Sequence, residues 1–188
     1  MRLSREEKER SHERIISSAA KLFRRDGIEG ASVGDVMQDA GLTHGGFYKH
    51  FDTKEALLIA ALDRAFEETL AWLGPKQPDE EPAATAGNFR KTYLSNEHVD
   101  APSMGCPIAA LGIDIARGTK QMKARFGMGV RRVVSLLARG STGTQRMREA
   151  RALRQIAMMA GAVIIARASD PDTAREVMAA CRDRSASN

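Results

Sequence analysis

Apolar residues recur three and four positions apart along most of the 188 residues of this chain. This spacing places them on one face of an α-helix. No run of β-branched residues alternates with polar ones, as a half-buried strand would require. The longest uncharged apolar run, residues 156–166, is shorter than the roughly 18 residues needed to cross a bilayer. The sequence therefore predicts an all-α protein without a membrane span, in which residues 156–166 form a buried helix.

The N-terminus and the cysteines argue against several classes of protein. Charges alternate through residues 1–14, so this segment is neither a signal peptide nor an acid-poor transit peptide, and we expect a cytoplasmic protein. Cys106 and Cys181 are too few and too far apart for a disulfide scaffold or a four-ligand zinc site. We expect no metal and no other cofactor.

Positive charge is concentrated in one part of the chain. The net charge is +5, but residues 117–154 contain eleven lysines and arginines against one acidic residue, Glu149. Residues 1–54 are nearly balanced, with ten basic and nine acidic residues. Basicity alone therefore does not locate a nucleic-acid site. The basic stretch is either a solvated helix face or a surface that faces an anion.

Capping signals divide the N-terminal third of the chain into helices. Ser4 and Ser32 each have an acidic residue three positions later, the spacing of a capping box that satisfies free backbone donors. Gly27 and Gly41 suit the left-handed positions that end a helix. The expected buried stripes of these two helices are Ile15, Ile16, Ala19 and Phe23, and then Val33, Val36, Met37 and Ala40.

Similar signals extend the helical prediction to the rest of the chain. Thr43 can cap a third helix through Phe51, and Asp52 or Thr53 can cap a long fourth helix over residues 54–73. Three prolines within residues 74–82 predict a loop. Further helices are expected over residues 83–96, 106–118, 119–139, 144–168 and 171–184, the last of them capped by Asp170 with Pro171 in its first turn.

Two short helices that follow a longer one are typical of a helix-turn-helix DNA reader, or of a small helical subdomain. The third predicted helix contains Gly45 and Gly46, which together cost on the order of 1.5 to 2 kcal/mol relative to alanine. That cost indicates that another surface approaches the backbone. Side chains able to donate to phosphates or base edges surround the glycines: Thr43, His44, Tyr48, Lys49 and His50.

The segments that carry this arrangement are similar to a known family. Residues 15–23 with Gly27, residues 32–40 and the run AGLTHGGFYKHFDTKEALL resemble the N-terminal DNA-binding domain of the TetR family of transcriptional repressors. The resemblance implies a three-helix DNA-binding domain over residues 1–53, whose third helix enters the major groove. It also implies a ligand-binding and dimerisation domain over residues 54–188, and a homodimer that an inducer releases from a palindromic double-stranded operator.

The resemblance assigns roles to individual residues. Ser32, Thr43, Tyr48 and Lys54 match positions that usually hold phosphates, and His44, Gly45 and Lys49 match positions that usually face bases. His50 is a further donor in the same segment. Gly34 and His44 depart from the residues common at their positions, which affects sequence preference more than DNA binding itself.

The resemblance also implies that the last two helices form the dimer interface. The expected contact residues lie on stripes at helical spacing and are Leu153, Ile156, Ala160, Ile164, Val177, Met178 and Cys181. The alternative for these stripes is a core within one chain. We expect dimerisation because two recognition helices are needed to read a two-part site.

Cys106 is the residue of the C-terminal part with possible chemistry. It lies between Gly105 and Pro107, at the expected start of a helix, where the dipole would lower its pKa and favour the thiolate. The segment GCPIAALGIDIAR also resembles one found in TetR-type regulators, some of which respond to electrophiles or oxidants. The alternative role is that of a small pocket-lining hydrophobe.

The sequence accordingly predicts a small inducer that is either largely apolar or thiol-reactive. Aromatic and methionine side chains are the candidates to line its pocket together with Cys106, although core packing explains most such residues. These candidates are Trp72, Phe89, Tyr93, Met104, Phe126 and Met158.

Motifs of common enzyme classes are missing from the sequence. It contains no GxxxxGK phosphate loop, no GxGxxG after a strand and no GxSxG elbow, so we do not expect an enzyme. The other competing class is a helical scaffold that binds only protein. A salt-dependent mobility shift of a short palindromic duplex would distinguish a DNA reader from such a scaffold.

Overall fold

The structure, a computed structural model, describes residues 5–77 and 79–183. All regular elements in these two ranges are helices, which confirms the predicted all-α class. In chain order they are α1 (Arg5–Asp26), α2 (Val33–Asp39), the 3₁₀ helix η1 (His44–Lys49), α3 (Lys54–Leu73), α4 (Pro82–Tyr93), α5 (Asn96–Asp100), the 3₁₀ helix η2 (Pro102–Met104), α6 (Pro107–Arg117), α7 (Lys120–Ala138), α8 (Gln145–Ala168) and α9 (Pro171–Arg182). No helix among them combines the length and the apolar character that crossing a bilayer requires.

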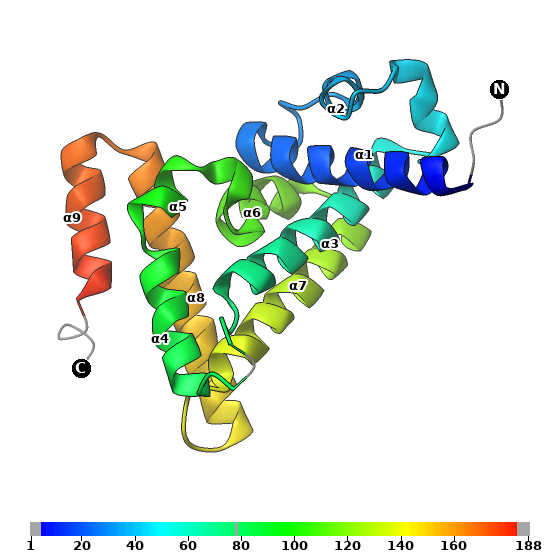
Figure 1. The fold of residues 1–188 in the computed structure, drawn as a ribbon. Helices are drawn as coiled ribbons and strands as arrows, with labels where there is room; N and C mark the ends of the chain where they lie inside the picture. The colour runs from blue at the N-terminus through cyan, green and yellow to red at the C-terminus, as the bar shows by residue number, and fades with distance from the viewer. Residues whose placement is uncertain (1–4, 78, 184–188) are drawn as a thin grey trace.

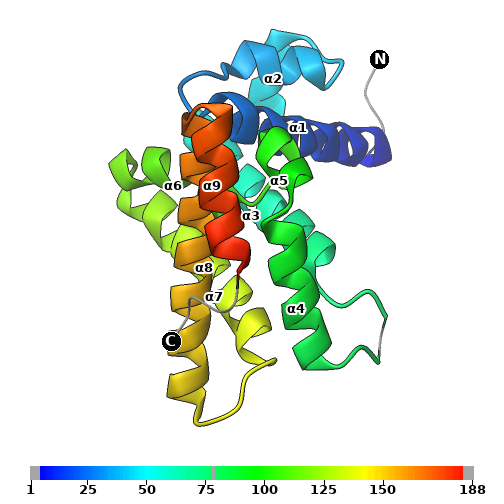
Figure 2. The same ribbon diagram turned by 90° about the vertical axis from the view of Figure 1, so that its left-hand side faces the viewer.

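The helices are arranged around a diagonal pair. In Figure 1, α1 crosses the top of the molecule with α2 above it, and α3 and α7 run diagonally downward side by side. α8 packs against both α7 and α9. Figure 2 shows α9 in front of α8, with α4 standing beside them. The surface of α2 and η1 therefore lies at one end of the molecule, above the helices of the C-terminal part.

Short-range signals set the first helix boundaries as predicted. At the start of α2, Asp35 N donates to Ser32 Oγ at 3.1 Å, and Ser32 N donates to the Asp35 carboxylate at 2.8 Å. Gly27 and Gly41 have φ angles of 79° and 69° after α1 and α2. These angles lie in the left-handed region that glycine adopts most easily. The predicted cap at Ser4 lies outside the described residues.

The longer helices also begin at their predicted caps. Thr53 accepts a hydrogen bond from the Ala56 amide at 3.0 Å and so caps α3, while Asp170 accepts from two amides of α9. α9 ends at Arg182 in the structure, and the predicted end at residue 184 lies outside the described residues.

The helix predicted over residues 83–96 is α4, which ends at Tyr93, and the chain continues in two short helices, α5 and η2, that were not predicted. Ser95 starts a new helix because its side chain accepts a hydrogen bond from the His98 amide at 3.2 Å, which makes it the N-cap of α5. Pro102 then ends α5 and begins η2, since proline fits only the first turn of a helix. These two short helices bring His98 next to Cys106.

The buried residues form two hydrophobic cores that meet along α3. The first core joins α1, α2 and η1 to the N-terminal half of α3 and to α6, and it includes the predicted stripe residues Ile15 and Phe23. The second begins at Phe66 and joins the rest of α3 to α4, α7, α8 and α9. A boundary after residue 53 would separate α3 from a core to which it contributes, and the two-domain division remains a prediction.

Candidate functional site

The exposed surface of α2 and η1 is the part of the chain that the sequence assigned to DNA. The turn between them is fixed locally, because Leu42 N donates to Met37 O at 2.8 Å after the left-handed Gly41. Phe47 and Phe51 are 2% and 8% exposed and pack inward, with ring centroids 6.0 Å apart. These two anchors set the direction in which the other side chains of η1 point.

The third helix is tighter and shorter than predicted. It is a 3₁₀ helix over residues 44–49, with hydrogen bonds such as Gly46 N to Thr43 O at 2.9 Å, and it ends before Phe51. Thr43 occupies the N-cap position, but its side chain makes no capping hydrogen bond. Two adjacent glycines and a missing cap disfavour a full α-helix, so the packing of Phe47 holds this backbone.

Five of the predicted DNA contacts share one exposed surface: Thr43, His44, Gly45, Tyr48 and Lys49. Tyr48 is 71% exposed, and its ring meets Phe47 edge-on. A Cβ added to Gly45 would meet nothing within 4 Å, so the backbone there is open to another surface. A Cβ at Gly46 would lie 3.4 Å from Met37 Cε, and this second glycine is therefore explained by packing within the chain.

Ser32 and Lys54, two of the three remaining predicted DNA contacts, form hydrogen bonds within the chain. Ser32 Oγ donates to Asp35 Oδ2 at 2.6 Å, and the hydrogen bonds from Ser32 lower the pKa of that carboxyl group. Lys54 Nζ donates to Ile28 O at 2.7 Å, so its ammonium group links α3 to the turn that follows α1. A phosphate contact by either residue would have to compete with these bonds.

His50 faces the interior more than its predicted role requires. Its ring centroid lies 5.8 Å from that of His12, and its Nδ1 is buried without a hydrogen-bond partner among the described residues. Burial, and then electrostatic interaction with His12, Lys8 and Lys49, lowers the pKa of His50. A neutral, half-buried ring suits packing better than phosphate binding.

The predicted dimer stripe is divided between the interior of this chain and its surface. Ile156, Ala160 and Met178 are 3%, 5% and 3% exposed, and Val177 and Cys181 pack partly against the second core. This corrects the expectation that all of these residues face a partner, because α8 and α9 pack their stripes against their own chain. Ile164 is half-buried, and Leu153 is 50% exposed.

Several of the predicted ligand-binding residues meet around His98. Phe89 and Tyr93 are fully buried with parallel rings 5.8 Å apart, and Trp72 meets His98 edge-on at 5.0 Å. Three other candidates lie elsewhere. Met104 and Met158 are 64% and 36% exposed, and Phe126 packs against Phe66 between the two cores.

Cys106 occupies the predicted N-cap position of α6, but the expectation that its pKa is lowered there is wrong. Its side chain is completely buried, and this burial raises the pKa of the thiol. The hydrogen bonds that favour the thiolate do not outweigh the loss of solvation. The structure therefore favours the alternative in which Cys106 is a packed small hydrophobe.

His98 is the polar residue of this interior that sequence reasoning missed. Its ring accepts a hydrogen bond from Cys106 N at Nε2 (3.0 Å), and its Nδ1 donates to Tyr93 O (2.6 Å). A ring that accepts at one nitrogen and donates at the other is neutral, and burial lowers the pKa of His98 to about 4. Among the described residues, no three His, Cys, Asp or Glu side chains gather in a way that could hold a metal ion.

The low pKa of His98 predicts a loss of stability in mild acid. Below its ordinary pKa of 6.5 the unfolded chain takes up a proton that the folded protein binds only near pH 4. Stability is therefore lost progressively as the pH falls through this window, by about 2 kcal/mol at pH 5 relative to pH 7. Urea denaturation at both pH values should show this loss in the wild type and a smaller loss in His98→Gln. If NMR shows that the His98 imidazole titrates near pH 6.5, the assignment of a lowered pKa to His98 is wrong.

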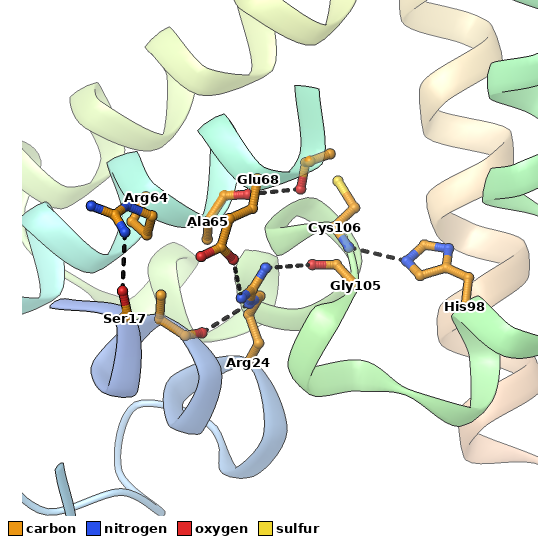
Figure 3. A network of polar contacts seen from close by, with 10 residues as sticks. Ser17, Arg24, Arg64, Ala65, Glu68, His98, Gly105 and Cys106 are labelled. Atoms are coloured by element: carbon orange, nitrogen blue, oxygen red, sulfur yellow. Dashed lines mark hydrogen bonds and ion pairs between the residues drawn. The ribbon is translucent and has the colours of Figure 1, made fainter. Parts of the chain in front are cut away.

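A network of polar contacts joins α1 to this interior (Figure 3). The Arg24 side chain is 1% exposed and donates to Ala20 O (2.8 Å) on its own helix, to Gly105 O (3.2 Å) and to Glu68 Oε2 (2.5 Å) on α3. Gly105 precedes Cys106, whose backbone amide donates to His98. Two residues 81 positions apart are thus joined by the guanidinium group, and the helix that supports α2 and η1 is fastened to the segment before α6.

The chain is similar to bacterial regulatory proteins. The family model described as "Bacterial regulatory proteins, tetR family" matches residues 15–61, the segment that contains α2 and η1. An uncharacterized HTH-type transcriptional regulator of Mycobacterium tuberculosis is 30% identical over 131 residues, which are 69% of this chain and 64% of that protein. The match therefore spans less than two thirds of the relative's length.

Solved structures agree over nearly the whole chain. The crystal structure of a TetR-family regulator from Cytophaga hutchinsonii superposes with a TM-score of 0.73 and 24% identity, covering 96% of this chain and 94% of that one. A TetR transcriptional regulator from Chloroflexus aurantiacus gives a TM-score of 0.72 and 25% identity, with 94% of each chain covered.

Proposed function

The chain belongs to the TetR family of bacterial regulatory proteins, and on that premise we propose that it represses transcription by binding a roughly palindromic operator as a homodimer. The observation that carries this proposal is the exposed surface formed by Thr43, His44, Gly45, Tyr48 and Lys49 on η1. Hydroxyl, imidazole, ammonium and open backbone donors lie together there on a buried aromatic anchor. Such donors match phosphate oxygens and the base edges of a major groove.

An exposed row on α8 supports the homodimer. Leu153 and Ile165 are 50% and 47% exposed, Ala157 is exposed between them, and a Cβ at Gly161 would meet nothing within 4 Å. These residues are four positions apart and form one ridge with small residues at its middle, where two backbones can approach closely. The proposed interface therefore keeps Leu153 from the predicted stripe, but leaves out Ile156 and Ala160, which are buried within this chain.

The Arg24 network supports control by a small molecule. Its bond to Gly105 O fastens α1 to the segment that leads into α6, so a shift of that segment is passed to the helix beneath the DNA-binding surface. Because Cys106 is buried and its pKa is raised, we propose an inducer that binds noncovalently rather than a thiol-reactive one.

Operator fragments selected from genomic DNA by the purified protein test DNA binding directly. We expect Tyr48→Ala to weaken binding to all duplexes by about tenfold, because this residue is assigned to the backbone. Lys49→Ala should weaken binding to the selected operator by a similar factor. It should also relax the preference for a particular base at one position of the operator. Affinities from mobility shifts at several salt concentrations separate the two roles.

A matched control and two contrary outcomes make this test decisive. Arg132→Ala removes an exposed basic side chain from α7, next to Val133 of the second core, and should leave the affinity unchanged. If Tyr48→Ala and Lys49→Ala each weaken binding to the operator and to random DNA equally, the assignment of Tyr48 to the DNA backbone and Lys49 to a base is wrong. If no duplex binds in a salt-dependent way, the chain is a protein-binding scaffold instead.

A further inference from the structure

A groove of about 740 Å³ opens between α4 and α5 on one side and the end of α7, the middle of α8 and the end of α9 on the other. One wall is a stripe of α4 at helical spacing, which includes Ala83, Ala86, Gly87, Arg90 and Lys91. The aromatic, methionine and cysteine residues that the sequence predicted to bind a ligand do not line it. Small-molecule sites usually measure roughly 300 to 1,000 Å³, so the size suits a ligand.

The groove is lined by apolar residues toward the start of α4. The walls meet tightly at Gly140, where an added Cβ would lie 2.6 Å from both Ala86 Cβ and Pro82 O. Next to this contact, a Cβ added to Gly87 would meet nothing within 4 Å. The space in front of Gly87 therefore accepts an apolar body without displacing protein atoms.

The groove is cationic toward the end of α4. Arg90, Lys91 and Arg182 line it against a single carboxylate, Glu97. Hydrogen bonds from its own backbone amide and from Ser95 lower the pKa of Glu97, so that side chain is ionised at neutral pH. The lining thus has an excess of positive charge, which favours an anion.

Within residues 5–77 and 79–183, no carboxylate forms a hydrogen bond with Arg90 or Arg182, although the charge of Arg182 also lowers the pKa of Glu97. Arg90 donates through Nη2 to backbone carbonyls at the end of α9, the nearest being Cys181 O at 2.7 Å. Its Nε and Nη1 have no acceptor among the described residues. Arg182 donates to Leu94 O and Asn96 Oδ1, each at 2.7 Å. These bonds to neutral acceptors fix the two guanidinium groups in place and leave their charge available.

We infer that the groove binds an amphipathic organic anion, with its apolar body against Ala86 and Gly87 and its carboxylate or phosphate head at Arg90 and Lys91. Planar guanidinium groups recognise both kinds of head group, and burial of the apolar body supplies affinity. This inference rests on the proposed function, because it names the chemical class of the inducer. It replaces the largely apolar inducer predicted from the sequence.

α5 connects the groove to the DNA-binding surface. Asn96 lines the groove, and His98, two residues later on the same short helix, holds the Cys106 amide. The preceding carbonyl, Gly105 O, accepts from Arg24 on α1 (Figure 3). A ligand that shifts the start of α5 therefore moves the segment to which α1 is fastened.

Three probes of equal chain length separate the charge of the head from the apolar body. Decanoate should bind at least about tenfold more tightly than decan-1-ol, and decylamine should bind most weakly, as measured by calorimetry on the full chain without DNA. Decyl phosphate in place of decanoate shows which anionic head the groove prefers. Trp72, the single tryptophan, meets His98 edge-on at 5.0 Å, so its fluorescence should change when decanoate moves α5.

Two pairs of variants locate the binding. Gly87→Leu fills the groove, and Gly127→Leu makes the same change on α7, where an added Cβ also meets nothing within 4 Å. Only Gly87→Leu should weaken the affinity for decanoate, by at least tenfold, while both variants stay folded and keep operator binding. Lys91→Glu should remove the preference for decanoate over decan-1-ol, and Lys123→Glu, which changes an exposed lysine on α7, should keep it.

Each contrary result overturns a defined part of the inference. Equal binding of all three probes, or equal loss in both glycine variants, shows that the groove is not the site. No binding of any probe shows that the groove is closed, for example by a partner subunit. Tight binding of decanoate that changes neither Trp72 fluorescence nor operator affinity overturns the connection through α5. Loss of operator binding without any probe counts against the proposed function alone.

Discussion

Replacing Leu153 and Ile165 together by glutamate is expected to give a monomer and to weaken operator binding by at least about 100-fold. Two DNA-binding surfaces held in one dimer make the second contact with a palindrome intramolecular, which raises affinity by roughly 10² to 10⁴ without any new contact. A monomer keeps only the affinity of one surface for one half-site. This is the largest functional effect that a change far from η1 should produce.

The geometry of α8 explains why these two positions are sensitive. Both side chains are about half exposed on a single ridge, with Ala157 and Gly161 between them. Burying a glutamate in a close contact between two copies of this ridge leaves an unpaired charge out of water, which costs several kcal/mol. Within the isolated chain the same side chains remain solvated, so folding should be unaffected.

Analytical ultracentrifugation and mobility shifts on full and half operators measure the two effects. Met128→Glu changes a methionine on α7 that is 49% exposed and should leave both the dimer and operator affinity unchanged. A double variant that remains dimeric, or a monomer that binds the full palindrome as tightly as the wild type, would show that this ridge is not the interface.

Gly129→Ala is expected to lower the free energy of unfolding by about 2 to 3 kcal/mol through overpacking. Gly129 lies on α7 where it crosses α3, and an added Cβ would come within 2.2 Å of Phe66 Cδ2 and Cε2 and 2.5 Å of its Cγ. The Phe66 ring is 1% exposed and held edge-on against Phe126, so it has no free space to enter. The two helices must separate, and the contact that joins the two cores is weakened.

Gly127, two residues earlier on the same helix, is the matched control. A Cβ there meets nothing within 4 Å, so Gly127→Ala should raise the free energy of unfolding by about 1 kcal/mol through helix propensity alone. Urea denaturation followed by circular dichroism should therefore show that the free energy of unfolding changes in opposite directions for two identical substitutions. Two stabilising changes would contradict the tight crossing of α3 and α7.

The sequence by itself determined the features that depend on neighbouring residues. Helix starts at Ser32, Thr53 and Asp170, and left-handed ends at Gly27 and Gly41, follow from hydrogen bonds and backbone angles within a few positions. The all-α class and the inward faces of the N-terminal helices follow from periodicity. The sequence also predicted the exposed donors around η1, because burial of the two aromatic residues of this short segment leaves its other side chains in solvent.

Only the tertiary structure decided which buried faces meet and which remain free. Cys106 has its pKa raised because segments remote in sequence cover it completely, an effect that its position at a helix start could not reveal. His98 becomes a structural acceptor, and Arg24 reaches Gly105, through contacts that helical periodicity does not encode. On α8, an apolar stripe at helical spacing fits a chain's own core as well as a partner's. The division of that helix between core and exposed ridge depends on where α7 and α9 pack, because burial is set by the distances between elements and not by the order of residues along one of them.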